Sequence, residues 1–261
     1  KNFMISLKNY EEIEIMNEGG RKLARILEEL AKNCVVGMSA KEIDNLASRL
    51  FKKENTKPAF LNYKPKGATR AFPANICISL NDVIVHGIPK KEIIFKEGDL
   101  VKIDAGLIYK NLYADSAITI GIGKISYKAQ KLIKVTKEAL KRAIDQCVVG
   151  KTLGDIGYAI SSYVFKNKMD VAEDLVGHGI GYHLHEDPVV YNIGQKGKGL
   201  KLEKGMALAI EPMVCLGNGA IIENNDESFS TLDKSLSAHF EHTVIITDDL
   251  PIITTNNNLW K

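Results

Sequence analysis

The residues from Gly98 to Gly123, GDLVKIDAGLIYKNLYADSAITIGIG, alternate between apolar and polar side chains in two runs. A period of two is typical of half-buried β-strands, and a polar turn near Tyr109–Leu112 separates the runs. The segment is therefore predicted to be a β-hairpin. Asp104 and Asp115 interrupt the apolar runs at nearly equal distances from the turn, so we expect their side chains to lie close to opposite one another.

Two opposed carboxylates in an apolar hairpin require an explanation. Directly opposed residues have Cβ atoms about 4.5–5.5 Å apart, and like charges at that separation are destabilising. Either a cation lies between the two aspartates, or one carboxyl group is protonated, or one side chain faces solvent at a sheet edge. Of these interpretations, the pattern favours a metal ion.

An internal repeat is the second pattern in the chain. The segment Cys34–Lys53 (CVVGMSAKEIDNLASRLFKK) aligns with Cys147–Lys166 (CVVGKTLGDIGYAISSYVFK), 113 positions later. In each copy a helix-like stretch precedes the motif. A Ser or Thr followed three residues later by an acid is then typical of a capping box, which predicts the start of a second helix. Each half of the chain is therefore predicted to begin with a pair of helices.

Two further matches follow in the same order. His86–Pro89 (HGIP) corresponds to His185–Pro188 (HEDP), and Lys96–Asp104 (KEGDLVKID) corresponds to Glu203–Glu211 (EKGMALAIE). Three matches in one order indicate a duplication. We predict a single domain over residues 1–261, with two similar α/β halves at roughly 1–120 and 121–261 around one site.

Composition narrows the class of protein. The 261 residues are 45% hydrophobic and 26% charged, which is ordinary for a globular domain and argues against disorder. A net charge of +3 does not indicate nucleic-acid or membrane binding. The four cysteines form no Cys-x-x-Cys pair, so we interpret them as reduced. No apolar run approaches a membrane span and no signal peptide is evident, so we expect a cytoplasmic protein.

Histidines are concentrated in the segment Val176–Val190, VGHGIGYHLHEDPVV. It contains His178, His183 and His185, which are three of the six histidines in the chain. The segment is either a polar loop that happens to be rich in histidine or a surface that presents imidazoles to a metal or a substrate.

The second half of the chain supplies two further carboxylates. Glu211 ends the apolar strand MALAIEP at the repeat position of Asp104, and Glu241 begins the β-branched run in HFEHTVIIT. Four carboxylates and one imidazole suit Mn²⁺, Fe²⁺, Co²⁺ or Zn²⁺. Four anions nearly neutralise two ions, and paired ions about 3.5–4 Å apart can hold a bridging hydroxide for hydrolysis. The candidate ligands are Asp104, Asp115, His178, Glu211 and Glu241.

Taken together, five segments resemble methionine aminopeptidase type I: SLNDVIVHGIP, VKIDAGLIYKNLYADSA, GHGIGYHLHEDP, AIEPMV and SAHFEHTVIIT. This resemblance implies the α+β pita-bread fold, in which two pseudo-symmetric halves and an antiparallel sheet enclose a central dinuclear metal site. It also implies a metalloexopeptidase that removes the initiator methionine from nascent proteins and peptides through a metal-bridged hydroxide, with a small second residue preferred.

The resemblance assigns roles to individual residues. The five candidate ligands would bind two divalent ions, with Asp115 and Glu241 as bridges. His86 and His185 would hydrogen-bond the substrate, and Glu211 would also handle the proton of the attacking hydroxide. The resemblance further implies a methionine pocket that includes Cys77, Phe72 and Phe229.

Some residues depart from the family pattern or have no role in it. The segment KPKGATR (residues 64–70) stands where a shorter Gly-rich link is common, which weakens an assignment of Phe60 and Tyr63 to the pocket. Leu184 stands where a Phe is usual, and Phe229 where a Trp is frequent. The remaining histidines are interpreted as side chains on the surface or behind the ligands; they are His183, His239 and His242.

Three alternatives stay open at this point. A prolidase or aminopeptidase P on the same fold usually carries an extra N-terminal domain, for which we see no room. A binding protein that lost catalysis should have lost ligands, and a structural metal protein would not need the extra histidines. The expected partners are nascent N-termini, in a monomeric protein without membrane contact. The basic loop Gly194–Lys201 is a candidate ribosome contact, although such loops are more often simply solvated.

Overall fold

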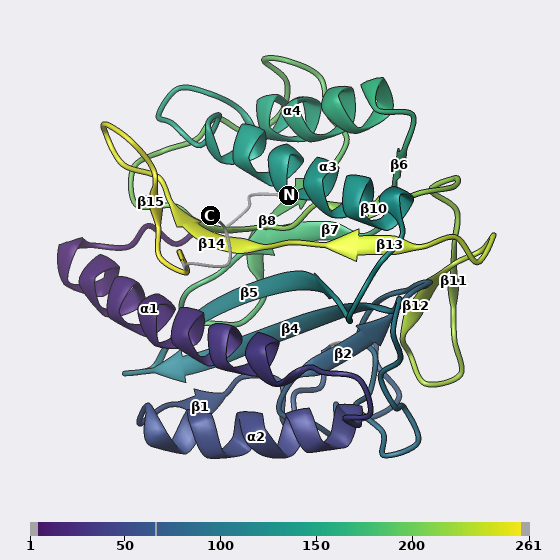
Figure 1. Ribbon diagram of the computed structural model, residues 1–261. Helices are drawn as coiled ribbons and strands as arrows, with labels where there is room; N and C mark the ends of the chain where they lie inside the picture. The colour runs from purple at the N-terminus through teal and green to yellow at the C-terminus, as the bar shows by residue number, and fades with distance from the viewer. Residues whose placement is uncertain (1–4, 66, 257–261) are drawn as a thin grey trace.

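The computed structural model describes residues 5–65 and 67–256. Within these residues, antiparallel sheets lie between two pairs of helices, one pair on each outer side of the molecule (Figure 1). The helices are α1 (Tyr10–Asn33), α2 (Ala40–Lys53), α3 (Tyr127–Ile144) and α4 (Leu153–Lys166). This mixture of helices and antiparallel strands agrees with the predicted α+β class.

The strands form four sheets in the described part of the chain, and all pairings are antiparallel. In the first, β4 (Leu100–Tyr109) pairs with β1 (Lys57–Pro58), β2 (Cys77–Leu80) and β5 (Leu112–Gly121). The second has the order β13 (Ser237–His239), β10 (Met213–Cys215), β6 (Asp170–Val171). The third has the order β11 (Ile221–Glu223), β12 (Phe229–Thr231), β3 (Val83–Val85). The fourth has the order β15 (Ile252–Ile253), β14 (His242–Ile245), β9 (Ala207–Ile210), β7 (Val176–Gly179), β8 (Glu186–Tyr191).

The predicted capping boxes are present at both repeated helices. At α2 the Ser39 side chain accepts from the backbone N–H of Glu42, whose carboxylate accepts from the backbone N–H of Ser39. Thr152 and Asp155 form the same arrangement at α4. These contacts satisfy backbone donors that a helix start otherwise leaves unpaired, which explains why both helices begin at these residues.

The predicted hairpin is β4 and β5, and its turn lies in the predicted segment Tyr109–Leu112. Lys110 and Asn111 both have positive φ, at 47° and 66°, and form a tight two-residue turn. This turn pairs Asp104 with Ala117 and Asp115 with Gly106. The two aspartates are therefore diagonal neighbours on one face instead of directly opposed residues, because the centre of the turn lies one residue further along the chain than equal spacing requires.

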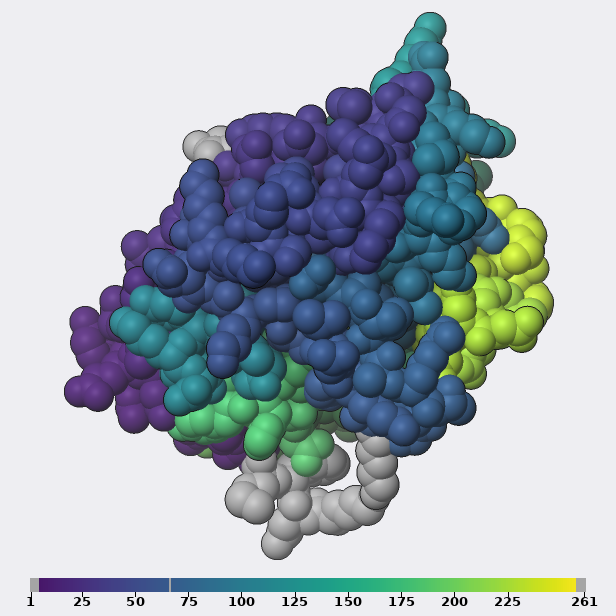
Figure 2. All heavy atoms as spheres, turned by 90° about the horizontal axis from the view of Figure 1, so that it is seen from below, coloured from purple at the N-terminus to yellow at the C-terminus, as the bar shows by residue number. Residues whose placement is uncertain are grey.

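The core of the described residues consists of a large cluster under the helices, a smaller one near the hairpin and a third around Ile84 and Met213. The cluster near the hairpin contains Met16, Phe60, Cys77 and Leu184. Figure 2 views the side that α2 covers, with purple and blue N-terminal segments over much of the face and the yellow-green segment of β11 and β12 at one edge. Among the described residues, no helix combines the length and the apolar character needed to cross a bilayer.

We expect Ser39→Ala to lower the free energy of unfolding by about 1 kcal/mol, because α2 loses its N-cap acceptor. Chemical denaturation at equilibrium measures the change. Ser162→Ala, inside α4, is the matched control, and helix propensity predicts no loss there. Equal stability of the Ser39 variant and the parent protein would contradict the role of the cap.

Candidate metal centre and active site

The five predicted ligands come from separate elements that meet in one place. Asp104 lies on β4, Asp115 on β5 and His178 on β7. Glu211 directly follows β9, and Glu241 directly precedes β14. Because β9 and β14 pair with Ile210 opposite His242, their next residues, Glu211 and Glu241, lie beside each other at the end of this ladder.

Hydrogen bonds to the backbone of two ligand residues tie the two halves together. Thr243 Oγ1 accepts from the N–H of Asp115 at 2.9 Å and donates to the carbonyl of Asp115 at 2.8 Å. Ser116 Oγ donates to the carbonyl of Glu241 at 2.7 Å, and the N–H of Glu241 donates to the carbonyl of Ala117 at 2.9 Å. The positions of Asp115 and Glu241 are therefore set by the same contacts that join β5 to the segment before β14.

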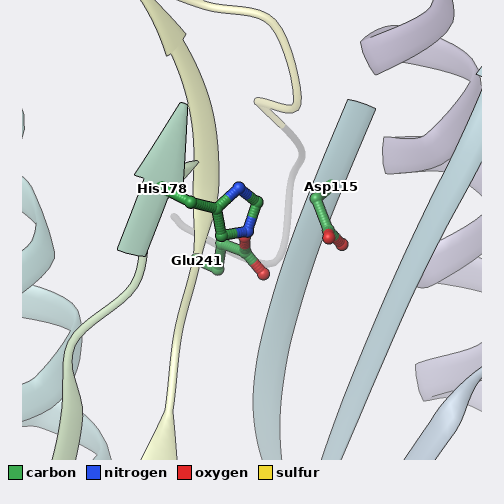
Figure 3. Close-up of side chains that lie close together, drawn as sticks. All are labelled: Asp115, His178 and Glu241. Atoms are coloured by element: carbon green, nitrogen blue, oxygen red, sulfur yellow. The ribbon is translucent and has the colours of Figure 1, made fainter. Parts of the chain in front are cut away.

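The side-chain atoms form two overlapping groups that could each hold an ion. In one group, Asp115, His178 and Glu241 offer ligand atoms within 4.8 Å of one another. Figure 3 shows the His178 ring next to the Glu241 carboxylate, with Asp115 on a neighbouring strand. The other group is Glu211, His239 and Glu241. Asp104 lies beside the first group, on the wall of the same cavity.

Burial raises the pKa values of all four carboxyl groups, and repulsion by neighbouring carboxylates adds to this for Asp104, Glu211 and Glu241. Burial raises the pKa of Asp115 to about 7. The pKa of Asp104 is held well above its usual range by burial and then by the charge of Asp115. The pKa values of Glu211 and Glu241 are also well above normal, first through burial and then through the neighbouring carboxylates. Without a cation, the four groups cannot all be ionised at neutral pH.

Several side-chain atoms of the predicted ligands have no hydrogen-bond partner in the described part of the chain and are free to bind divalent ions. Asp104 Oδ1 and Glu241 Oε1 are buried without a hydrogen-bond partner among the described residues. His178 Nδ1 donates to the Gly179 carbonyl at 2.9 Å, which leaves its Nε2 lone pair for an ion. Burial lowers the pKa of His178 to about 4, so the imidazole is neutral at pH 7, as a metal ligand must be.

The predicted substrate histidines lie on the wall of the same cavity. The rings of His185 and His178 are 4.5 Å apart, and His185 Nδ1 shares a hydrogen bond of 2.8 Å with the hydroxyl of Tyr63. Burial lowers the pKa of His185 to about 3 and also lowers the pKa of His86. His86 has a φ of 60°, an uncommon conformation for a residue other than glycine and one often found at functional sites.

The cavity has a volume of about 760 Å³, large enough for a short peptide end. Its wall includes all five predicted ligands and the predicted pocket residues Cys77 and Phe72. Phe229 is not part of the wall, and its ring packs edge-on against His86 with centroids 5.8 Å apart. Phe60, Tyr63 and Leu184 do line the cavity, although the unusual segment after Tyr63 had weakened that assignment for the two aromatic residues. Of that segment, Lys66 lies outside the described residues.

A family model described as Metallopeptidase family M24 matches residues 14–248. The chain belongs to metallopeptidase family M24. Within that M24 family, the curated methionine aminopeptidase of Clostridium acetobutylicum is 43% identical over 253 residues, covering 97% of this chain and 99% of the relative. The predicted resemblance to methionine aminopeptidases is thereby confirmed.

Solved structures of M24 relatives share the fold. The crystal structure of methionine aminopeptidase from Thermotoga maritima superposes with a TM-score of 0.92 at 41% identity, covering 97% of this chain and all of that one. A prolidase from Pyrococcus furiosus superposes with a TM-score of 0.74 at 22% identity. The match covers 96% of this chain and 65% of the prolidase, and at that identity it shows the fold alone.

Two contacts near the candidate active site were not predicted from the sequence. Tyr63 was set aside because of the segment that follows it, yet it contacts His185. Glu186 pairs with Lys8 at 2.8 Å, and both side chains are nearly inaccessible to solvent. The signal in the sequence was that Glu186 directly follows His185. The N-terminal segment therefore helps to hold the loop that carries this histidine.

We expect the metal-free protein to lose stability as pH rises from about 6.5 through about 7, because at lower pH the buried histidines, whose pKa values burial lowers, act in the opposite direction. The folded state keeps protons on the buried carboxyl groups that the unfolded chain has already released, and the pKa of Asp115 is about 7. Divalent ions replace these protons, so stabilisation by Mn²⁺ should grow over the same range. Thermal unfolding of chelator-treated protein, with and without Mn²⁺, measures both effects. Asp115→Asn is the control and should flatten the dependence, whereas a pH-independent difference would contradict this electrostatic account.

Proposed function

We propose that this protein removes N-terminal methionine from nascent proteins and peptides in a metal-dependent reaction, with a small second residue preferred. The observation that carries the proposal is one cavity that contains both the buried carboxylate and histidine cluster and the pocket residues Cys77 and Phe72. The identity of 43% to a curated methionine aminopeptidase over nearly the whole chain supports the same reaction.

The proposed cofactor is a pair of divalent ions, of Co, Mn, Fe or Zn. Two overlapping ligand groups that share Glu241 support a pair, and four carboxylates match the charge of two ions. Asp115 and Glu241 would bridge the ions, and Asp104, His178 and Glu211 would complete the set. When bound, such ions polarise a carbonyl group and lower the pKa of water.

The protein side chains would supply proton transfer and orientation. Glu211 lies on the wall of the same cavity, where its carboxylate can accept a proton and return it while the proposed ions offset its charge. His86 and His185 have lowered pKa values and stay neutral, so each can donate one N–H to the substrate without adding charge. If Tyr63 donates to Nδ1 of His185, the proton on Nε2 is left for the substrate.

The methionine side chain would bind between Cys77, Phe72, Phe60 and Leu184. Cys77 is 4% exposed, and Phe60 and Phe72 meet edge-to-face with centroids 6.4 Å apart. Sulfur and aromatic groups provide polarizable contacts for a thioether. Leu184 is smaller than the Phe usual at this position, so the pocket would accept a somewhat wider range of first residues.

The wider biological setting follows from the same proposal. Residues 1–261 would form one catalytic domain, with halves at roughly 1–120 and 121–261, that acts as a monomer in the cytoplasm on nascent N-termini. Transient contact with the ribosome would use the loop Gly194–Lys201, in which Lys196, Lys198 and Lys201 are all exposed.

We expect protein reloaded with Mn²⁺ or Co²⁺ to release methionine from Met-Ala-Ser and not from Met-Lys-Ser, because only a small second residue fits. Metal-stripped protein should be inactive. Asp104→Asn, which keeps the size of the side chain and removes its charge, should lower the rate by at least about 100-fold through weaker ion binding. Chromatographic measurement of free methionine gives the rates. The proposal fails if no divalent ion restores release.

Tyr63→Phe should reduce kcat/KM for Met-Ala-Ser by about 2- to 10-fold, the effect of losing one hydrogen bond, because His185 loses the partner that orients it. Steady-state kinetics measure the change. Tyr109→Phe, which removes an exposed hydrogen bond to Glu18, is the matched control and should leave the rate unchanged. An unaltered rate in the Tyr63 variant would show that this contact does not orient His185 for the reaction.

A further inference from the structure

His239 is a buried imidazole without a hydrogen-bond partner. Its exposed fraction is 1%, and neither Nδ1 nor Nε2 has a hydrogen bond to any described residue. Buried polar groups are nearly always paired, so an orphaned ring next to a candidate active site requires an explanation. The sequence pattern had placed His239 only among side chains on the surface or behind the ligands.

The backbone of His239 is held on both sides. Its N–H donates to Thr119 Oγ1 at 2.9 Å, and the same hydroxyl donates to its carbonyl at 2.7 Å. On β13, His239 also pairs with Met213 of β10, two residues after Glu211. The position of the His239 backbone is therefore set by the fold before any ligand arrives.

The ring faces the Glu211 carboxylate. His239 Nε2 lies 3.4 Å from Glu211 Oε2, and His178 Nε2 lies 3.5 Å from Glu211 Oε1. Since Nδ1 of His178 is already bonded to Gly179, its Nε2 is the atom available to an ion. Of the two imidazoles, only His239 can thus serve Glu211 as a hydrogen-bond donor.

We propose that His239 is a positioning residue whose Nε2–H donates to Glu211 Oε2 and holds this carboxylate in the orientation needed for proton transfer. The inference rests on the proposed role of Glu211. A contact of 3.4 Å is long for a hydrogen bond, but such contacts commonly shorten when a site binds its substrate. His239 itself touches neither substrate nor the atoms that react.

An alternative role for the His239 imidazole is metal binding. His239, Glu211 and Glu241 lie close enough to share an ion, so His239 could be a sixth metal ligand. A ligand would use the Nε2 lone pair, whereas the positioning role needs a proton on Nε2. The tautomer and the metal content therefore separate the two.

Three variants test the proposal: His239→Leu, His239→Gln and His239→Asn. The Gln amide nitrogen reaches about as far as Nε2, whereas the Asn amide is shorter and cannot reach Glu211. We expect Leu and Asn to lower kcat for Met-Ala-Ser by about 10- to 100-fold, the effect of losing a hydrogen bond to a charged group. KM and the metal content per chain should match those of the parent protein. Gln should recover most of kcat.

Several results would overturn the positioning role. Loss of bound metal in the Leu variant would make His239 a ligand, and an unchanged kcat would leave it without a role in proton transfer. Equal kcat values for Gln and Asn would also contradict it, and this comparison stands even if the Leu variant does not fold. Thermal unfolding checks the fold of each variant.

A measurement that does not depend on catalysis tests the role of His239 separately from the proposed function. Nitrogen-15 NMR of the parent protein should show His239 as the Nε2–H tautomer, and a proton on Nδ1 would contradict the proposal whether or not the protein cleaves peptides. Failure of the parent protein to release methionine would instead refute the proposed function, because the His239 variants are compared only with an active parent.

Discussion

The crowding of four carboxyl groups in a buried space is the constraint on which the rest of this structure depends. Asp104, Asp115, Glu211 and Glu241 all have raised pKa values, and burial is the first cause for each. Such a cluster is costly unless cations neutralise it. The fold keeps it in place through hydrogen bonds from the Thr243 and Ser116 hydroxyls to the backbone of Asp115 and Glu241, and these neutral groups hold the cluster whatever its charge.

Neutral histidines complement the charged cluster. Burial lowers the pKa values of His178, His185 and His239, so the imidazoles add no positive charge that would compete with divalent ions. The two residue types thus have separate tasks in the proposed reaction of this M24 member. Carboxylates hold ions and move a proton, whereas imidazoles bind an ion, orient the substrate or hold Glu211.

Local features were predicted well, and features that depend on exact register were not. The hairpin, both capping boxes and the strands that carry the ligands could be recognised from periodicity and short motifs. Asp104 and Asp115 are diagonal neighbours and not directly opposed residues, because the turn at Lys110 and Asn111 is not equidistant from them. Phe229 was assigned to the pocket by the family resemblance, and its ring packs edge-on against His86.

The sequence by itself determined the secondary structure around the site and the chemical types of its ligands, since both depend on neighbouring residues and on spacing within short motifs. Only the tertiary structure decided which distant side chains meet. Tyr63 reaches His185 across 122 positions, and Thr119 holds His239 across 120. These contacts arise where separate sheets pack together, and no local pattern encodes the relative placement of two sheets.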